Sequence, residues 1–328
     1  MALYKSPLTI AWAFFHFSQI GAACAIPGPC MPKEGPAFLT LPDTLDGVVG
    51  DIGIYADYVK GLPGTNQEDN AGGFINLNLA FPLPNSFCHS FGFQIGGSYG
   101  VYEIQGANFY PSYSQRKVNE QLFATAGLFY KSAHDYGLNA AVVYDWMYNR
   151  NLSSLDLTLQ LFQVRYELSY LTCCTDEIGV WGTIHSNCRK KHTIDCDVAF
   201  RALDQVSIFW RHLFNNCCEA KIWAGIPYRD DDRFTNRGRF LVGGNFYAPL
   251  PCNWSIEGHG MYLQTYDCQS GNKIHYAFNL ALGVNYAFGG SDCCKKPDDF
   301  CSFRAYLPVA NNSNFITNAA STPAALRI

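Results

Sequence analysis

The sequence predicts an all-β protein, a transmembrane antiparallel up-and-down β-barrel of about twelve strands. The first observation is the stretch 274–288, where every even position is large and apolar and every odd position is small or polar. A period of two marks a strand with two unlike faces, and this one is longer than the five or six residues usual in soluble domains. The second observation is compositional: charged residues make up 15%, aromatic residues 15%, and mean hydropathy is -0.06. Alternating faces average to neutral hydropathy while presenting aromatic side chains to lipid.

The third observation is the spacing of aromatic residues in the same stretch. Tyr276 and Tyr286 share its apolar face, roughly 33 Å apart along the strand and about 23 Å apart along the membrane normal at a tilt of ~45°. That fits the apolar band of about 25 Å between the two aromatic girdles of a membrane barrel. Residues 280–288 also resemble the closing strand of bacterial outer-membrane barrels. The alternative is a central strand of a large soluble sandwich.

The N-terminus has the composition of an export signal. Lys5 precedes an apolar run, and small residues at 21–25 suit cleavage after Ala23 or Ala25. Cys24 leaves a lipoprotein open as the alternative, although Gly21 stands where a lipoprotein signal carries an aliphatic residue. No later stretch reaches eighteen apolar residues, which excludes helical membrane spans. The expected order is a signal peptide (1–25), a periplasmic lead-in or plug (26–46), the barrel (47–288) and a Cys-containing tail (289–328).

Alternation predicts eleven strands before the stretch 274–288. In the sixth, the apolar positions change from odd (Leu155 to Leu161) to even (Val164 to Tyr170). Because a shift of one residue exchanges the two faces, we expect a β-bulge near Leu161–Phe162. An even strand count places both ends of the barrel, and the short segments flanking it, on the periplasmic side, with the longer polar loops outside. The eleven strands are expected at about 51–58, 75–81, 91–101, 120–131, 138–147, 155–170, 177–185, 197–213, 219–228, 239–250 and 254–266.

The cysteines gather on one rim of the predicted barrel. Fourteen cysteines in an exported chain indicate an oxidising compartment and disulfides. The spacing typical of zinc sites is absent, so no metal is expected. Cys188 and Cys196 flank a basic outer loop and are candidates to close it. A closed barrel needs no staples, so the rim cysteines are predicted to link the protein to other envelope proteins. These rim cysteines are Cys88, Cys173, Cys174, Cys217, Cys218, Cys252, Cys293, Cys294 and Cys301.

Export, aromatic alternation and cysteines in the turns together resemble the major outer membrane protein of the chlamydial group and its porin-like relatives. The resemblance is one of pattern over about residues 24–301. It implies a porin in the outer membrane of a Gram-negative bacterium, with cysteine-rich envelope proteins as disulfide partners. The chain departs from the family in its 40 residues after Phe288 and in its lower strand count.

The expected function is passive diffusion of small hydrophilic solutes or ions, and the alternative is a structural or adhesive barrel with a plugged lumen. The sequence has eight histidines, but no nucleophile lies beside a base, and no cofactor motif is present. We therefore expect no enzyme. A net charge of -4 offers no footprint for nucleic acid. The candidate pore-lining residues are Asp145, Asp156, Arg165, Glu167, Arg201, Arg211, Lys221, Arg239, Glu257 and His259. Their signs nearly balance, so ion preference stays open.

Overall fold

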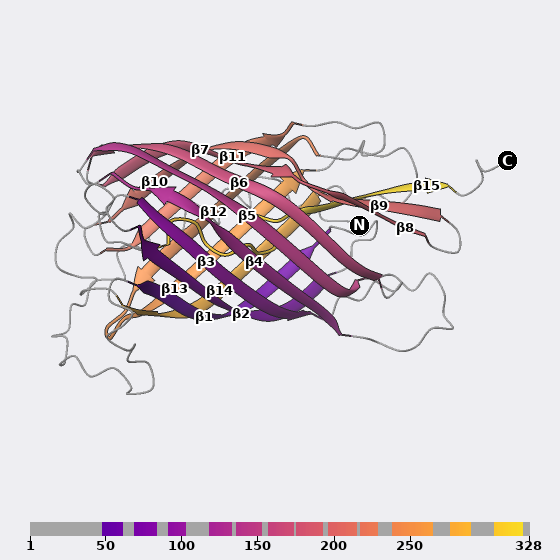
Figure 1. Cartoon of the computed structure of the whole chain (residues 1–328), viewed down its shortest axis with the longest axis horizontal. Coiled ribbons are helices and arrows are strands. Elements are labelled where there is room, and N and C mark those ends of the chain that lie inside the picture. Colours follow the sequence, from indigo (N-terminus) through magenta and orange to yellow (C-terminus); the bar gives the residue numbers. More distant parts are fainter. Residues whose placement is uncertain are drawn as a thin grey trace, which may run out of the picture.

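The computed structural model confirms the predicted fold class. Its described residues form a closed antiparallel barrel of twelve strands and a separate three-stranded sheet. Figure 1 shows the small sheet projecting beyond one end of the barrel. The structure describes residues 48–61, 69–83, 91–102, 118–132, 136–152, 157–173, 175–192, 196–214, 217–228, 238–264, 276–289 and 305–323.

The twelve barrel strands follow one another as neighbours in chain order, and the first pairs with the last. They are β1 (Val49–Lys60), β2 (Asp69–Pro82), β3 (Phe91–Tyr102), β4 (Asn119–Tyr130), β5 (Gly137–Leu152), β6 (Leu157–Cys173), β7 (Asp176–His185), β10 (Gln205–Leu213), β11 (Glu219–Pro227), β12 (Phe240–Pro249), β13 (Trp254–Gln264) and β14 (Tyr276–Phe288). The small sheet has the order β15 (Thr317–Pro323), β9 (Cys196–Ala202), β8 (Cys188–His192).

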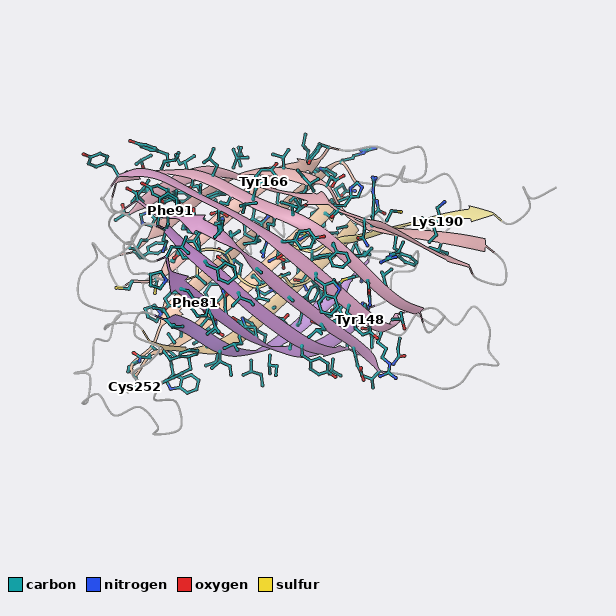
Figure 2. The ribbon with its side chains drawn as sticks, in the orientation of Figure 1. Phe81, Phe91, Tyr148, Tyr166, Lys190 and Cys252 are labelled. Carbon is teal, nitrogen blue, oxygen red and sulfur yellow. The ribbon has the colours of Figure 1, made fainter. Side chains whose placement is uncertain are left out.

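The barrel has two distinct ends. We call the end with the short β12–β13 connection at Cys252 the turn side, and the end from which β8 and β9 project the loop side. In Figure 2, Cys252 and Lys190 of β8 lie at opposite ends of the molecule. Since β1 begins at the turn side and β14 returns there, the seam between them closes the barrel, for example at Asp57↔Ala281.

The outer surface is apolar, as the alternation predicts. In β14, Leu282 is 55% exposed, whereas its neighbour Ala281 is buried in the barrel interior. Aromatic pairs lie near both ends of the strand: Tyr276 stacks on Tyr262, and Tyr286 meets Trp254 edge-on. An apolar exterior between aromatic residues is what a hydrocarbon layer requires of a barrel. Within the described ranges, no helix is long and apolar enough to cross a membrane.

The strand expected at 197–213 is two strands in different sheets. β10 continues the barrel beside β7, while β9 leaves it and pairs with β8 and β15. The break falls at Leu203–Asp204, where the Asp204 carboxylate accepts hydrogen bonds from the backbone N–H of His185 at 2.6 Å and from its imidazole at 2.7 Å. Apart from Asp204, the apolar residues keep the same even positions from Val198 to Trp210, so the alternation does not indicate the break.

The predicted disulfide between Cys188 and Cys196 is not formed. Cys188 pairs with Arg201, whereas Cys196 lies beyond the His192↔Asp197 pair at the far end of the hairpin. About five residues at ~3.3 Å each separate them along the ladder, and a disulfide requires Cα atoms within about 7 Å. Cys188 therefore has a free, exposed thiol.

The predicted bulge in β6 is also wrong at its position. The register of β6 on β5 runs without a shift from Leu171 to Leu159. Leu159 and Leu161 consequently face the barrel interior and are almost completely buried. They find apolar partners there, Phe123, Phe200 and Phe315, in one cluster of buried residues. Because the lumen is apolar beside Leu159 and Leu161, apolar residues occupy inward positions there, and the sequence pattern looks as if the strand had exchanged its faces.

The largest difference from expectation concerns the segment after β14. The sequence places it as a periplasmic tail, but residues 305–316, here called the plug segment, run through the barrel interior. Figure 1 shows this yellow segment leading to β15 outside the loop side. There, β15 pairs with β9 from Thr317↔Ala202 to Pro323↔Cys196. The predicted signal peptide and the lead-in at 26–46 lie outside the described residues.

Candidate functional site

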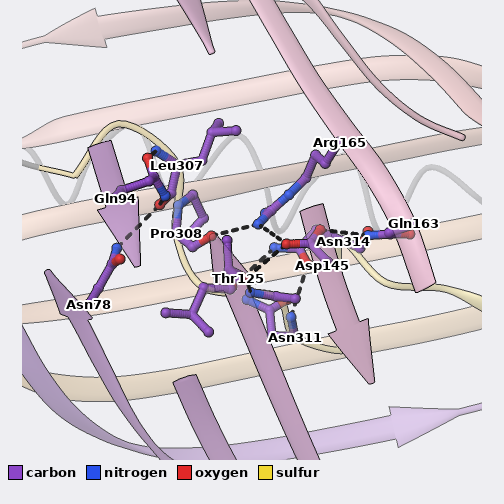
Figure 3. A network of polar contacts seen from close by, with 12 residues as sticks. Asn78, Gln94, Thr125, Asp145, Gln163, Arg165, Leu307, Pro308, Asn311 and Asn314 are labelled. Atoms are coloured by element: carbon purple, nitrogen blue, oxygen red, sulfur yellow. Dashed lines mark hydrogen bonds and ion pairs between the residues drawn. The ribbon is translucent and has the colours of Figure 1, made fainter. Parts of the chain in front are cut away.

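The lumen is the candidate functional site, and wall side chains bind the main chain of the plug segment inside it. Gln94 of β3 accepts from the backbone N–H groups of Tyr306 at 3.1 Å and Leu307 at 3.0 Å. Its amide N–H donates to the Leu307 carbonyl at 2.8 Å, and Asn78 of β2 donates to the same oxygen at 3.2 Å. These contacts, seen in Figure 3, satisfy backbone groups that have no strand partner.

A second group of wall residues centres on Asp145 of β5. Its carboxylate accepts from Thr125 at 2.7 Å and from Gln163 at 2.9 Å, and it pairs with Arg165 at 3.1 Å. Three of these side chains also reach the plug segment: Arg165 donates to the Pro308 carbonyl at 2.7 Å, Gln163 donates to the Asn314 carbonyl at 3.0 Å, and Thr125 accepts from Ala310 N–H at 2.9 Å. Figure 3 shows the whole group around the segment. The buried charge of Asp145 is therefore compensated, and its role is to orient plug-binding groups.

Tyr306 anchors the turn-side end of the plug segment. Its ring stacks near that of Phe129, with centroids 6.4 Å apart. Its hydroxyl contacts Glu177 at 3.0 Å and Ser169 at 2.9 Å. The Arg211 guanidinium lies 5.5 Å from the ring centroid, within cation–π range.

The loop-side end of the plug segment is held by apolar contacts. Phe315 is buried among the leucines of β6, and Ile316 is buried with Leu203, Leu241 and Met261. The Ile316 carbonyl accepts from Leu203 N–H at 2.8 Å. This contact leads directly into the β15–β9 pairing, so the segment is fixed at both ends.

Charged residues of the turn-side half pair with one another. Arg211 contacts Glu167 at 2.9 Å, Glu177 at 2.7 Å and Glu219 at 3.3 Å. Lys221 reaches the second oxygen of Glu167 at 2.5 Å. All the acidic and basic groups of this cluster have a partner of opposite sign, as buried charges require.

The structure brings six of the ten predicted pore-lining residues together. They line one cavity beside the plug segment: Arg165, Glu167, Arg211, Lys221, Glu257 and His259. Asp145 is buried in the plug-binding group described above. Arg201 belongs to β9, outside the barrel sheet, and Arg239 is exposed at the loop side. Neither therefore lines the cavity, and Asp156 lies outside the described residues.

Two predicted rim cysteines are placed in turns. Cys217 and Cys252 both have positive φ angles, 61° and 63°, and Cys252 is exposed at the turn side (Figure 2). Cys218, the neighbour of Cys217, is buried. Outside the described residues lie Cys88, Cys174, Cys293, Cys294 and Cys301, and the side chains of Cys173 and Cys196 are likewise not described.

Sequence reasoning missed the groups that bind the plug segment. Gln94, Asn78 and Thr125 are neutral, whereas the residues predicted to line the pore are charged residues and one histidine. The plug segment itself carries one usable signal: from Ala305 to Pro323 the sequence has no charged residue. A stretch of that length without charge in an exported chain favours burial.

A family model described as "Family of unknown function (DUF6666)" matches residues 47–317, which include both the barrel and the plug segment. No curated protein matches the chain. Among solved structures, a COG4313 outer membrane channel from Pseudomonas putida F1 has 13% identity and a TM-score of 0.47, covering 78% of this chain and 100% of its own. A FadL homologue from Pseudomonas aeruginosa has 10% identity and a TM-score of 0.44, covering 79% and 95%. An outer membrane phospholipase from Salmonella typhi has 8% identity and a TM-score of 0.40, covering 72% and 90%.

Proposed function

The chain belongs to the DUF6666 family, whose function is unknown, and from its barrel we propose that it is an outer-membrane channel for small hydrophilic solutes held closed by its own plug segment. The observation that carries the proposal is the plug segment itself, bound along the lumen from Tyr306 to Ile316. A permanently open porin would leave that space to water. The proposal therefore replaces passive diffusion through an open pore with diffusion that follows movement of the plug segment.

The contacts of the plug segment suit a segment that moves. Most are hydrogen bonds with neutral side chains such as Gln94 and Thr125, and each bond is worth about 0.5–1.5 kcal/mol net because water replaces it. Arg165 supplies the one charged contact in the Asp145 group. The lumen of a twelve-stranded barrel is wider than that of a filled eight-stranded barrel and narrower than that of a sixteen-stranded porin. A single segment can therefore close it.

Single-channel conductance tests the proposal. The full-length protein, refolded under oxidising conditions, should give no steady current in planar bilayers, whereas a chain ending at Arg304 should give step currents. A heat-modifiable band on gels serves as the control that the shortened barrel has folded. Equal currents from both proteins would show that the plug segment does not close the pore. Silence from a folded shortened barrel would favour the alternative, a structural or adhesive barrel.

We further propose that the barrel is exported through a cleaved signal peptide into a Gram-negative outer membrane and linked there to cysteine-rich envelope proteins. The exposed thiol of Cys252 at the turn side supports this. Cys188 provides a matched control, because it is also free and exposed but lies at the loop side. In native envelopes run without reductant, Cys252→Ser should reduce the high-mass species that collapse to a monomer on reduction, and Cys188→Ser should not. The same pattern in both variants would count against linkage through the turn-side rim.

A further inference from the structure

The plug segment leaves part of the lumen unfilled. Among the described residues, a cavity of 210 Å³ lies between it and the facing wall, in the turn-side half of the barrel. One water occupies about 30 Å³ in the liquid, so the cavity has room for several waters or for one solute of their combined size. Its wall comes mainly from β1, β2, β6 and β11 to β13, and its other side is the plug segment.

Apart from the Nε atoms of the ion-paired Arg165 and Arg211, five polar atoms in the lining of this cavity are buried without a hydrogen-bond partner among the described residues. Two are donors, the indole N–H groups of Trp181 and Trp223. Trp181 is only 6% exposed. Leaving such an atom unpaired destabilises the fold, so buried polar atoms nearly always have a hydrogen-bond partner. The remaining three are Asn76 Oδ1, Asn78 Oδ1 and His259 Nε2.

Aromatic rings surround these atoms. Tyr55 and Phe74 are stacked, with centroids 4.6 Å apart, and Trp181 meets Trp223 edge-on at 5.7 Å. His259 lies 6.1 Å from the Tyr55 ring. Rings of this kind offer flat apolar faces beside polar edges, which suits a ligand that has both C–H faces and polar groups.

The charged groups of the cavity do not call for a charged ligand. Arg211 and Lys221 already pair with Glu167, and Glu257 accepts from the Tyr55 hydroxyl at 2.9 Å. An anion would satisfy only the indole donors, and a cation would satisfy only the amide acceptors. A hydrocarbon would leave all five atoms unpaired.

A hydroxyl group both donates and accepts, so it satisfies either kind of unpaired atom. We propose that the cavity binds a neutral polyhydroxylated solute of monosaccharide size. This names the solute class of the proposed channel, but binding itself does not depend on conductance, because Tyr306 and Leu307 of the seated plug segment are part of the cavity wall.

Isothermal titration calorimetry of the full-length protein in detergent tests the inference, with D-glucose, inorganic phosphate and toluene as probes. We expect saturable binding of glucose alone. Trp223→Phe and Trp181→Phe keep an aromatic ring but remove the N–H donor, and each should weaken glucose binding about two- to tenfold. Trp254→Phe is the matched control, because Trp254 lies on the barrel exterior against Tyr286 and should bind glucose like the parent protein.

No saturable heat with glucose would overturn the inference and mean that water alone fills the cavity. So would preferential binding of phosphate or toluene, or identical affinities in the parent, Trp181→Phe and Trp223→Phe. If a tryptophan variant fails to fold, Asn76→Ala removes another of the unpaired atoms and should also weaken binding. Glucose binding by a protein whose shortened form never conducts would overturn the channel and leave the site intact.

Discussion

The residues that matter most in this lumen are neutral amides and hydroxyls. A carboxamide offers both a donor and an acceptor, so Gln94 can pair with a main-chain N–H and C=O at once. Such groups bind the backbone of a segment that belongs to no sheet, whatever its side chains are. At the residue scale, the wall therefore recognises the plug segment chiefly through its main chain, and shape decides where its side chains fit.

Gly96 of β3 shows this fit and provides a residue-scale prediction. A Cβ atom at Gly96 would lie 2.5 Å from Val309 Cγ2 of the plug segment and 2.8 Å from the Leu77 carbonyl oxygen. Gly96→Ala should therefore displace the plug segment, at a cost of about 1–3 kcal/mol typical of overpacking. The expected result is a higher open probability in single-channel recordings.

Gly97→Ala is the matched control on the same strand. A Cβ there would meet only the Phe123 carbonyl oxygen, at an ordinary 3.5 Å, so the channel should stay closed. Combining Gly96→Ala with Val309→Ala removes the Cγ2 atom and should restore closure in part. If Gly96→Ala and Gly97→Ala opened the channel equally, the effect would come from the strand and not from the plug segment.

At the scale of elements, alternation predicts strands well and their surroundings less well. The predicted and observed limits of most barrel strands differ by a few residues, because a period of two follows from the pleat itself. The rule that inward positions are polar failed for Leu159 and Leu161, because Phe315 supplies an apolar partner inside the lumen. The plug segment shows no period of two, because side chains of the wall, and not a neighbouring strand, satisfy its backbone hydrogen bonds. Local patterns could not indicate that contact between distant parts of the chain, nor the cavity that it borders.

The pairing of β15 with β9 provides the element-scale prediction. Seven residue pairs hold the chain beyond the plug segment against the projecting hairpin. A chain ending at Ile316 lacks this ladder and should lose protection of the amides in 305–316. Because several hydrogen bonds of about 1 kcal/mol each are lost, amide hydrogen exchange there should speed up about ten- to a hundredfold.

A chain ending at Pro323 keeps the whole ladder and is the control for that experiment. Its plug segment should exchange like that of the full-length protein. Fast exchange in both shortened chains, or slow exchange in both, would mean that β15 does not hold the plug segment in place.

The molecule as a whole is predicted to have its two flanking segments on opposite sides of the membrane. β1, the first strand, begins at the turn side, and β15 lies beyond the loop side. If the turns face the periplasm, a short epitope placed after Ile328 should be accessible to antibody on intact cells. Protease added outside should cut within 61–70, 105–117 or 229–237, the predicted outer loops.

An epitope inserted between Cys252 and Asn253, in the tight turn at the opposite end, is the control. It should react only after the outer membrane is permeabilised. If the epitope after Ile328 also required permeabilisation, while the outer loops were cut on intact cells, the chain would not cross the lumen in the native envelope.

The seam between β1 and β14 makes the barrel a closed ring, and the chain after β14 passes through that ring. Folded chains seldom thread themselves, so the order of assembly becomes a constraint. The strands must close around the segment, or the segment must be drawn through a finished ring as an extended strand. A folded domain fused after Ile328 would block the second route and permit the first. Departure of the segment, in contrast, breaks no pair in the seam, so the ring survives each opening intact.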